Sequence, residues 1–136
     1  MKKAINILLR ISKVLDIIVI VSSVIVFIVG LINIPFAIEL IQELEAAGDS
    51  ADVGSIIAFS FSISFAIIFP ILGVILSAGS IANIILVNKS LVRLQTAKTK
   101  SELRGLAIGT IITGVISSDT AAVAGILMLI IKDRQL

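Results

Sequence analysis

The chain has 136 residues, of which 58% are hydrophobic and 15% charged, and its formal net charge is only +2. Soluble domains are roughly 45–50% apolar, so this composition excludes an ordinary soluble domain and predicts one compact integral membrane protein. Because the chain has no Cys, His, Trp or Tyr, it has no disulfide, thiol nucleophile or imidazole base. We expect an all-α fold, since an isolated strand in lipid would leave its backbone polar groups unpaired.

The first 15 residues alternate basic and apolar positions. Their polar side chains recur mostly at gaps of three or four, which predicts a helix with a basic face suited to an anionic membrane surface. The same residues are equally compatible with the first turns of a span whose lysines reach toward water. The apolar run from Ile17 to Ile32 is longer than the ~7–15 residues of a signal-peptide core, so we expect an uncleaved anchor.

The first span is predicted at about residues 14–34. Asn33 and Pro35 predict a break there, because proline fits the first turn of a new helix better than the middle of an old one. Residues 35–47 then alternate apolar and acidic positions, which predicts an amphipathic helix on the outer surface. Gly48 is expected to end this helix, and Asp49 and Asp52 to cap the next one.

The second span is predicted at residues 53–87, a run without a charged side chain that exceeds the ~20 residues a spanning helix needs. Two spans plus a turn would need more residues and would place the acidic and basic loops on the same side, so one long span bent near Pro70 and Gly73 is favoured. Small residues recur every four positions and predict a surface for close helix contact: Gly54, Ala58, Ser62 and Ala66.

The order of charges predicts the orientation. Acidic residues lie before the second span, and a basic loop at residues 88–104 follows it. Because cytoplasmic loops carry excess Lys and Arg, we expect the N-terminus and this loop in the cytoplasm of a bacterial cell, with the protein in its cytoplasmic membrane. Contacts with anionic headgroups are expected from Lys2, Lys3, Arg10, Lys13, Lys89, Arg93, Lys98, Lys100 and Arg104.

The tail could be one span or a hairpin. One span of residues 105–131 would place Asp119 near the bilayer centre at a cost of ~2.5–3.5 kcal/mol. A hairpin of residues 104–117 and 119–132 lets Asp119 cap the last helix, although each arm is short for a ~30 Å core. We favour the hairpin, giving four spans, with three as the alternative. The pairs Gly105/Gly109 and Ala121/Gly125 are spaced for close helix packing.

The sequence contains few residues that are candidates for a catalytic, ion-binding or transport role. Asp119, Ser60, Ser64 and Asn83 could line a polar path, but hydroxyls and amides in membrane helices more often bond to a neighbouring helix or to their own backbone. Asp16, at the inner end of the first span, is expected to pair with Arg10 and Lys13. Phosphate-loop and metal-ligand spacings are absent from the sequence, and the basic loop lacks the interleaved aromatic residues of nucleic-acid binders.

These observations predict a non-catalytic protein without cofactors, embedded in a lipid bilayer. The leading interpretation is an accessory subunit that binds a membrane-protein partner or a second copy of itself through its small-residue surfaces. The alternative is a small ion or solute channel or transporter that uses Asp119 and the Ser60/Ser64 face.

Overall fold

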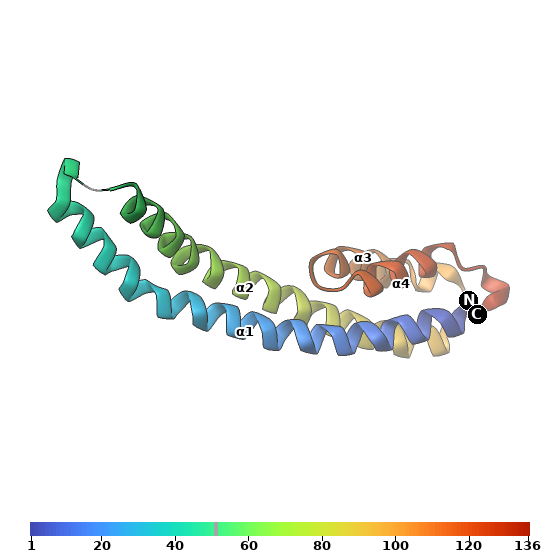
Figure 1. The fold of residues 1–136 in the computed structure, drawn as a ribbon. Coiled ribbons are helices and arrows are strands. Elements are labelled where there is room, and N and C mark those ends of the chain that lie inside the picture. Colours follow the sequence, from blue (N-terminus) through green and yellow to red (C-terminus); the bar gives the residue numbers. More distant parts are fainter. Residues whose placement is uncertain (51) are drawn as a thin grey trace. The chain divides into compact units, whose positions relative to one another are not determined.

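The computed structural model describes residues 1–50 and 52–136, and within them the chain forms helices and no strands (Figure 1). This confirms the all-helical fold, and two of its helices are long and apolar enough to span a membrane. The α-helices are α1 (Lys2–Ala47), α2 (Val53–Thr96), α3 (Arg104–Ser117) and α4 (Asp119–Ile130). Three short 3-10 helices join or follow them: η1 (Gly48–Ser50), η2 (Lys100–Glu102) and η3 (Asp133–Gln135).

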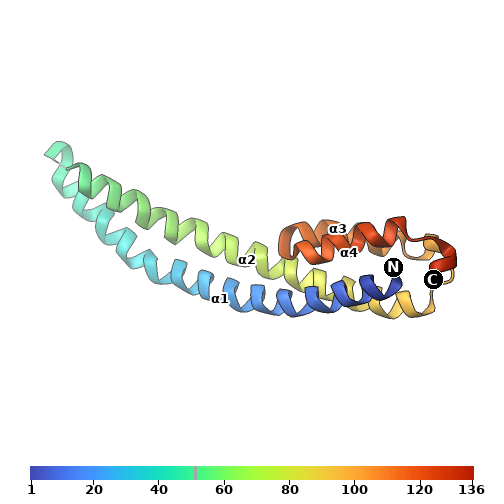
Figure 2. The same cartoon turned by 45° about the vertical axis from the view of Figure 1, so that its right-hand side comes forward.

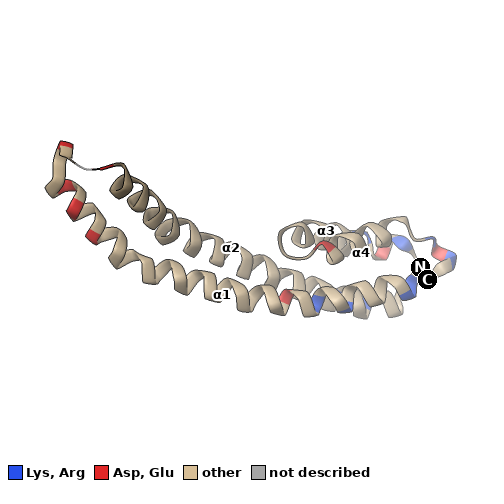
Figure 3. Ribbon diagram, in the orientation of Figure 1, with Lys and Arg blue, Asp and Glu red and all other residues tan. Residues whose placement is uncertain are grey.

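The described chain forms two compact units. The basic unit comprises Met1–Val21 and Leu76–Leu136, and the acidic unit comprises Ser22–Ile75. The basic unit contains all 11 Lys and Arg residues and only four acids, whereas the acidic unit contains five acids and no base (Figure 3). The small net charge of the chain therefore hides two oppositely charged units.

Helix α1 does not break at Pro35, so the separate outer helix predicted at residues 35–47 is wrong. Those residues are the last part of α1, with proline inside the helix. Proline removes one backbone donor, but a full break among apolar side chains would leave several backbone groups unpaired. Two residues before the proline, Asn33 Nδ2 also donates to the Val29 carbonyl oxygen at 2.7 Å. The predicted stop is confirmed: α1 ends at Ala47, and Gly48 has a φ of 56°.

Helix α2 begins as predicted and ends later than predicted. The Ser55 backbone N–H donates to Asp52 Oδ1 at 2.7 Å, so Asp52 caps the first turn. The helix continues through Pro70 to Thr96, which agrees with one long helix. Much of the predicted 88–104 loop is therefore helical. The buried face of α2 continues there through Ser90 and Leu94. Burial of these side chains stabilises the helix beyond its predicted end.

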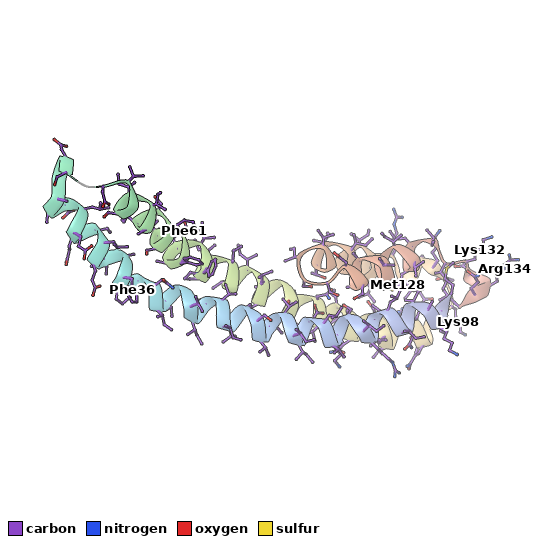
Figure 4. All side chains as sticks on the ribbon, viewed as in Figure 1. Phe36, Phe61, Lys98, Met128, Lys132 and Arg134 are labelled. Carbon is purple, nitrogen blue, oxygen red and sulfur yellow. The ribbon has the colours of Figure 1, made fainter. Side chains whose placement is uncertain are left out.

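Within the acidic unit, glycines mark the closest approach of α1 and α2. A Cβ on Gly30 would lie 2.3 Å from Pro70 Cδ, and one on Gly73 would lie 2.8 Å from the Ser23 carbonyl oxygen. Such separations leave no room for a side chain. Away from this contact the aromatic side chains Phe36 and Phe61 project outward, with 59% and 62% of their surface exposed (Figure 4).

The basic unit contains an apolar core. Helices α3 and α4 lie side by side as a hairpin, which both views of the ribbon show (Figures 1 and 2). The core draws on all four helices and the segments that follow α2 and α4: Ile5, Leu9, Val87, Leu94, Ala97, Leu103, Ala107, Ala124, Met128 and Ile131. The chain ends also meet in this unit, where Lys2 Nζ donates to the Leu136 carbonyl oxygen at 3.3 Å.

The hairpin turns at Ser118, which has an extended backbone (φ −158°, ψ 111°) between α3 and α4. Ser118 is therefore the N-cap of α4, and Asp119 lies in the first turn of that helix instead of capping it. A carboxylate there is favourable because it faces the positive end of the helix dipole. With 14 and 12 residues, the arms are ~21 Å and ~18 Å long.

Candidate functional site

The most unusual feature of the basic unit is a buried carboxylate on α1. Asp16 is fully buried together with Ser12, one turn earlier on the same helix. Asn83 of α2 donates its amide Nδ2 to Asp16 Oδ2 at 2.6 Å and to Ser12 Oγ at 3.1 Å. A carboxylate can only accept hydrogen bonds, so this contact requires the amide nitrogen of Asn83 to face Asp16.

Helix α3 holds Asn83 from the other side. Thr113 Oγ1 lies 2.7 Å from Asn83 Oδ1 and 3.0 Å from the Gly109 carbonyl oxygen, and it can donate its one hydrogen to either. Asn83 of α2 is thus hydrogen-bonded to side chains of both α1 and α3. A buried amide with both ends bonded avoids the desolvation cost of an unpaired polar group.

The cluster is incompletely bonded. Within the described chain, Asp16 Oδ1 and Ser80 Oγ are buried side-chain atoms without a hydrogen-bond partner. Ser80 is fully buried and precedes Asn83 by one turn of α2, which places both on the same helix face. The hydroxyl of Ser117, at the end of α3, donates to the Thr113 carbonyl oxygen at 2.9 Å and also faces Asp16. We call these residues the Asp16 cluster: Ser12, Asp16, Ser80, Asn83, Thr113 and Ser117.

The predicted pairing of Asp16 with Arg10 and Lys13 is wrong. Both basic side chains are exposed, and no Lys or Arg nitrogen of residues 1–50 or 52–136 forms an ion pair with Asp16. Among the described residues, an ion pair joins Arg93 and Glu102 at 3.0 Å, and half of the Arg93 side chain is exposed. Glu102 Oε1 also accepts from Thr99 Oγ1 at 3.2 Å. These contacts hold the end of α2 against the segment that leads into α3.

The other predicted polar residues have separate places. Asp119 is exposed at the start of α4. The hydroxyls of Ser60 and Ser64 donate to carbonyl oxygens of their own helix, on Ile56 at 3.0 Å and on Ser60 at 2.8 Å. This is the packing role that hydroxyls commonly have in apolar helices. Asn83 is the one member of the predicted set that belongs to the Asp16 cluster.

The predicted small-residue surfaces differ in what covers them. In the hairpin, a Cβ on Gly125 would lie 2.8 Å from the Ala107 carbonyl oxygen, and Ala121 is fully buried. Gly109 lies against the Leu86 side chain of α2, whereas Gly105 faces open space. On α2, Ser62 and Ala66 are half-buried, whereas Gly54 and Ala58 are exposed.

A signal for the Asp16 cluster was present in the sequence. Asp16, Ser23, Gly30 and Ala37 are seven residues apart and are all buried. A seven-residue repeat marks the seam along which two helices pack, and here it carries small and polar side chains. Asp16 could have been placed on this seam, but its partners could not, because Asn83 lies 67 residues away.

Much of the surface of the two long helices is apolar. Both are long and apolar enough to cross a membrane, and their most apolar stretches are only 11% and 6% buried. The basic side chains face water-accessible surface; one groove of about 480 Å³ is lined by Lys2, Lys3, Asn6, Ile7 and Arg10. Comparison with protein families, with curated proteins and with solved structures found no match.

Proposed function

We propose that this chain is an integral membrane protein that binds a membrane-protein partner, and that it does not catalyse a reaction. The observation that carries the proposal is the outward placement of large apolar side chains on α1 and α2. Along α1 they include Ile18, Val21 and Ile25, each more than half exposed. Soluble monomers rarely expose apolar patches larger than a few hundred Å², whereas a bilayer solvates such a surface.

The charges of the two units support the proposed orientation. The basic unit carries a net charge of +7 and the acidic unit −5. By the positive-inside tendency, the basic unit belongs at the cytoplasmic face of a bacterial cytoplasmic membrane. Its groove beside Lys2 and Arg10 suits anionic headgroups, whose attraction is worth ~1 kcal/mol per Lys or Arg near the surface.

Topology is testable because the natural chain has no cysteine. We expect Ala46→Cys to react with a membrane-impermeant maleimide in intact cells, and Thr96→Cys to react only after the membrane is opened. Labelling of Thr96→Cys but not Ala46→Cys in intact cells would overturn the orientation. Recovery of the unmodified chain from the soluble fraction would overturn the membrane location.

Partner binding is proposed from the exposed small residues of α2, since small side chains let another helix approach closely in lipid. The full chain would be purified from native membranes in mild detergent, and proteins that co-elute in a fixed ratio identified. We expect Ala58→Leu to reduce this co-elution, and Ile57→Leu, a nearly volume-conserving change at the exposed neighbouring position, to preserve it. Elution of the chain alone as a monomer would contradict the proposal.

An ion or solute transporter is the second candidate, and the buried carboxylate of Asp16 favours it. Ionisable residues inside membrane helices commonly mark ion pathways. Reconstituted protein that carries an ion flux abolished by Asp16→Asn would favour transport. A flux abolished by Asp119→Asn instead would identify the start of α4 as the pathway. If neither the natural chain nor a variant supports flux, transport is excluded.

A further inference from the structure

The Asp16 carboxylate has no positive partner in a place where it needs one. It is fully buried, and its Oδ2 accepts a hydrogen bond from Asn83, whereas its Oδ1 has no hydrogen-bond partner. Buried charges in proteins are normally paired or bound to a metal, because an isolated buried charge is very costly. The described chain supplies no Lys or Arg within ion-pair distance of Asp16, so either a bound cation or a proton has to neutralise the carboxylate.

The surroundings of Asp16 suit a hard metal cation. Hydroxyl groups of Ser12 on α1 and Ser117 on α3 face Asp16, and the buried hydroxyl of Ser80 lies one turn before Asn83 on α2. Oxygen atoms are the ligands that hard cations prefer. Two fully buried oxygen atoms, Asp16 Oδ1 and Ser80 Oγ, have no hydrogen-bond partner. Asn83 occupies the other carboxylate oxygen and is itself bonded by Thr113, which leaves Oδ1 as the free oxygen.

We propose that the Asp16 cluster binds one monovalent metal cation, with Na⁺ as the cation to test. Asp16 Oδ1 and Ser80 Oγ are its principal ligands, Ser12 and Ser117 contribute hydroxyl oxygens, and Asn83 orients the carboxylate. One carboxylate balances one positive charge, whereas a divalent ion would leave an uncompensated charge among apolar helices. The site is independent of partner binding, and it adds a ligand to the transporter candidate, but the binding test below needs no ion flux and so stands or falls separately from either function.

The test uses the full chain, purified in detergent in a buffer without Na⁺. Its thermal unfolding midpoint is measured while NaCl replaces choline chloride at constant ionic strength and pH. A ligand that binds only the folded state stabilises it by RT ln(1 + [L]/Kd), so we expect the midpoint to rise with Na⁺. The rise should disappear in Asp16→Asn and persist in Asp119→Asn, the matched change at an exposed aspartate.

If Asp16→Asn fails to fold, a second variant and direct binding of Na⁺ to the natural chain test the site. Ser80→Ala should weaken direct binding of radioactive ²²Na⁺ roughly tenfold, a loss typical of residues around a metal, while its far-ultraviolet circular dichroism stays unchanged. No Na⁺-dependent rise and no ²²Na⁺ binding by the natural chain would overturn the site. So would stabilisation that depends on pH and Asp16 but not on Na⁺, because the carboxylate would then hold a proton.

Discussion

The two units of this chain are held together by different kinds of contact. The basic unit has an apolar core drawn from all four helices and, beside it, a buried polar cluster joined across three of them. The acidic unit comprises parts of α1 and α2 together with η1, and glycines of the two long helices pack there against a proline ring and a backbone carbonyl. Specific hydrogen bonds hold the first unit in one arrangement, whereas shape complementarity holds the second. Five predictions test this contrast, starting with the largest expected effect.

The largest effect is expected at Asn83. Asn83→Leu removes the amide that donates to Asp16 and leaves a buried carboxylate without that donor, at a cost of about 3 kcal/mol. Equilibrium unfolding in detergent measures the loss. The matched control is Asn88→Leu, on the same helix at an exposed position. Equal stability of the two variants would show that the Asp16 cluster does not hold the basic unit together.

The turn of the α3–α4 hairpin should be nearly as sensitive. A Cβ on Gly114 would lie 2.5 Å from the backbone nitrogen of Ala122, which is not a flexible group. We expect Gly114→Ala to cost ~1–3 kcal/mol by overpacking. Gly105→Ala, where nothing lies within 4 Å, should be neutral or slightly stabilising because alanine is the better helix former. Thermal unfolding of the two variants gives the comparison.

Packing in the acidic unit can also be tested with one buried and one exposed glycine. Gly30→Ala places a methyl group against the Pro70 ring, and we expect a loss of ~1–2 kcal/mol because two helices can separate slightly where a four-helix core cannot. Gly54→Ala, at an exposed position, is the control. Cross-linking between single cysteines placed on α1 and α2 of this unit measures whether the helices separate. An unchanged cross-linking yield in Gly30→Ala would contradict close packing here.

A smaller effect is expected at the surface of the basic unit. Arg93→Gln removes the ion pair with Glu102, which joins the end of α2 to η2. Because half of Arg93 is exposed, the pair should contribute only ~0.2–1 kcal/mol, and added salt should reduce its contribution. A double-mutant cycle with Glu102→Gln at low and high salt isolates this term. A coupling energy insensitive to salt would show that the pair is shielded from solvent.

The smallest effect is local and depends on pH. The backbone N–H of Ser55 lowers the pKa of Asp52 below its ordinary value of 3.8. A carboxyl whose pKa is lowered by folding stabilises the folded state above its ordinary pKa and loses that effect as pH falls through the lowered value. Protection of the Ser55 amide against hydrogen exchange should therefore fall below about pH 4. In Asp52→Asn this acid-dependent loss should be absent.

The elements were more predictable than their contacts. The charge-free run predicted α2 as one long helix, and Gly48 and Asp52 predicted where α1 ends and α2 begins. The prediction from Pro35 was wrong, because proline costs an apolar helix one hydrogen bond and a steric clash, whereas ending the helix there would leave several backbone groups unpaired. The Asp16 cluster was missed for another reason. Its members come from segments far apart in the chain, and no local sequence pattern predicts which side chains of α1, α2 and α3 will form hydrogen bonds with one another.

The hydrogen bond between Lys2 and the last carbonyl group brings the two ends of the chain to one place. A short peptide could therefore join them, and new ends could be created between Ser50 and Val53 in the acidic unit. Such a circularly permuted chain would carry its tags on the acidic unit instead of the basic unit. It would give a handle for purification that leaves the basic groove free.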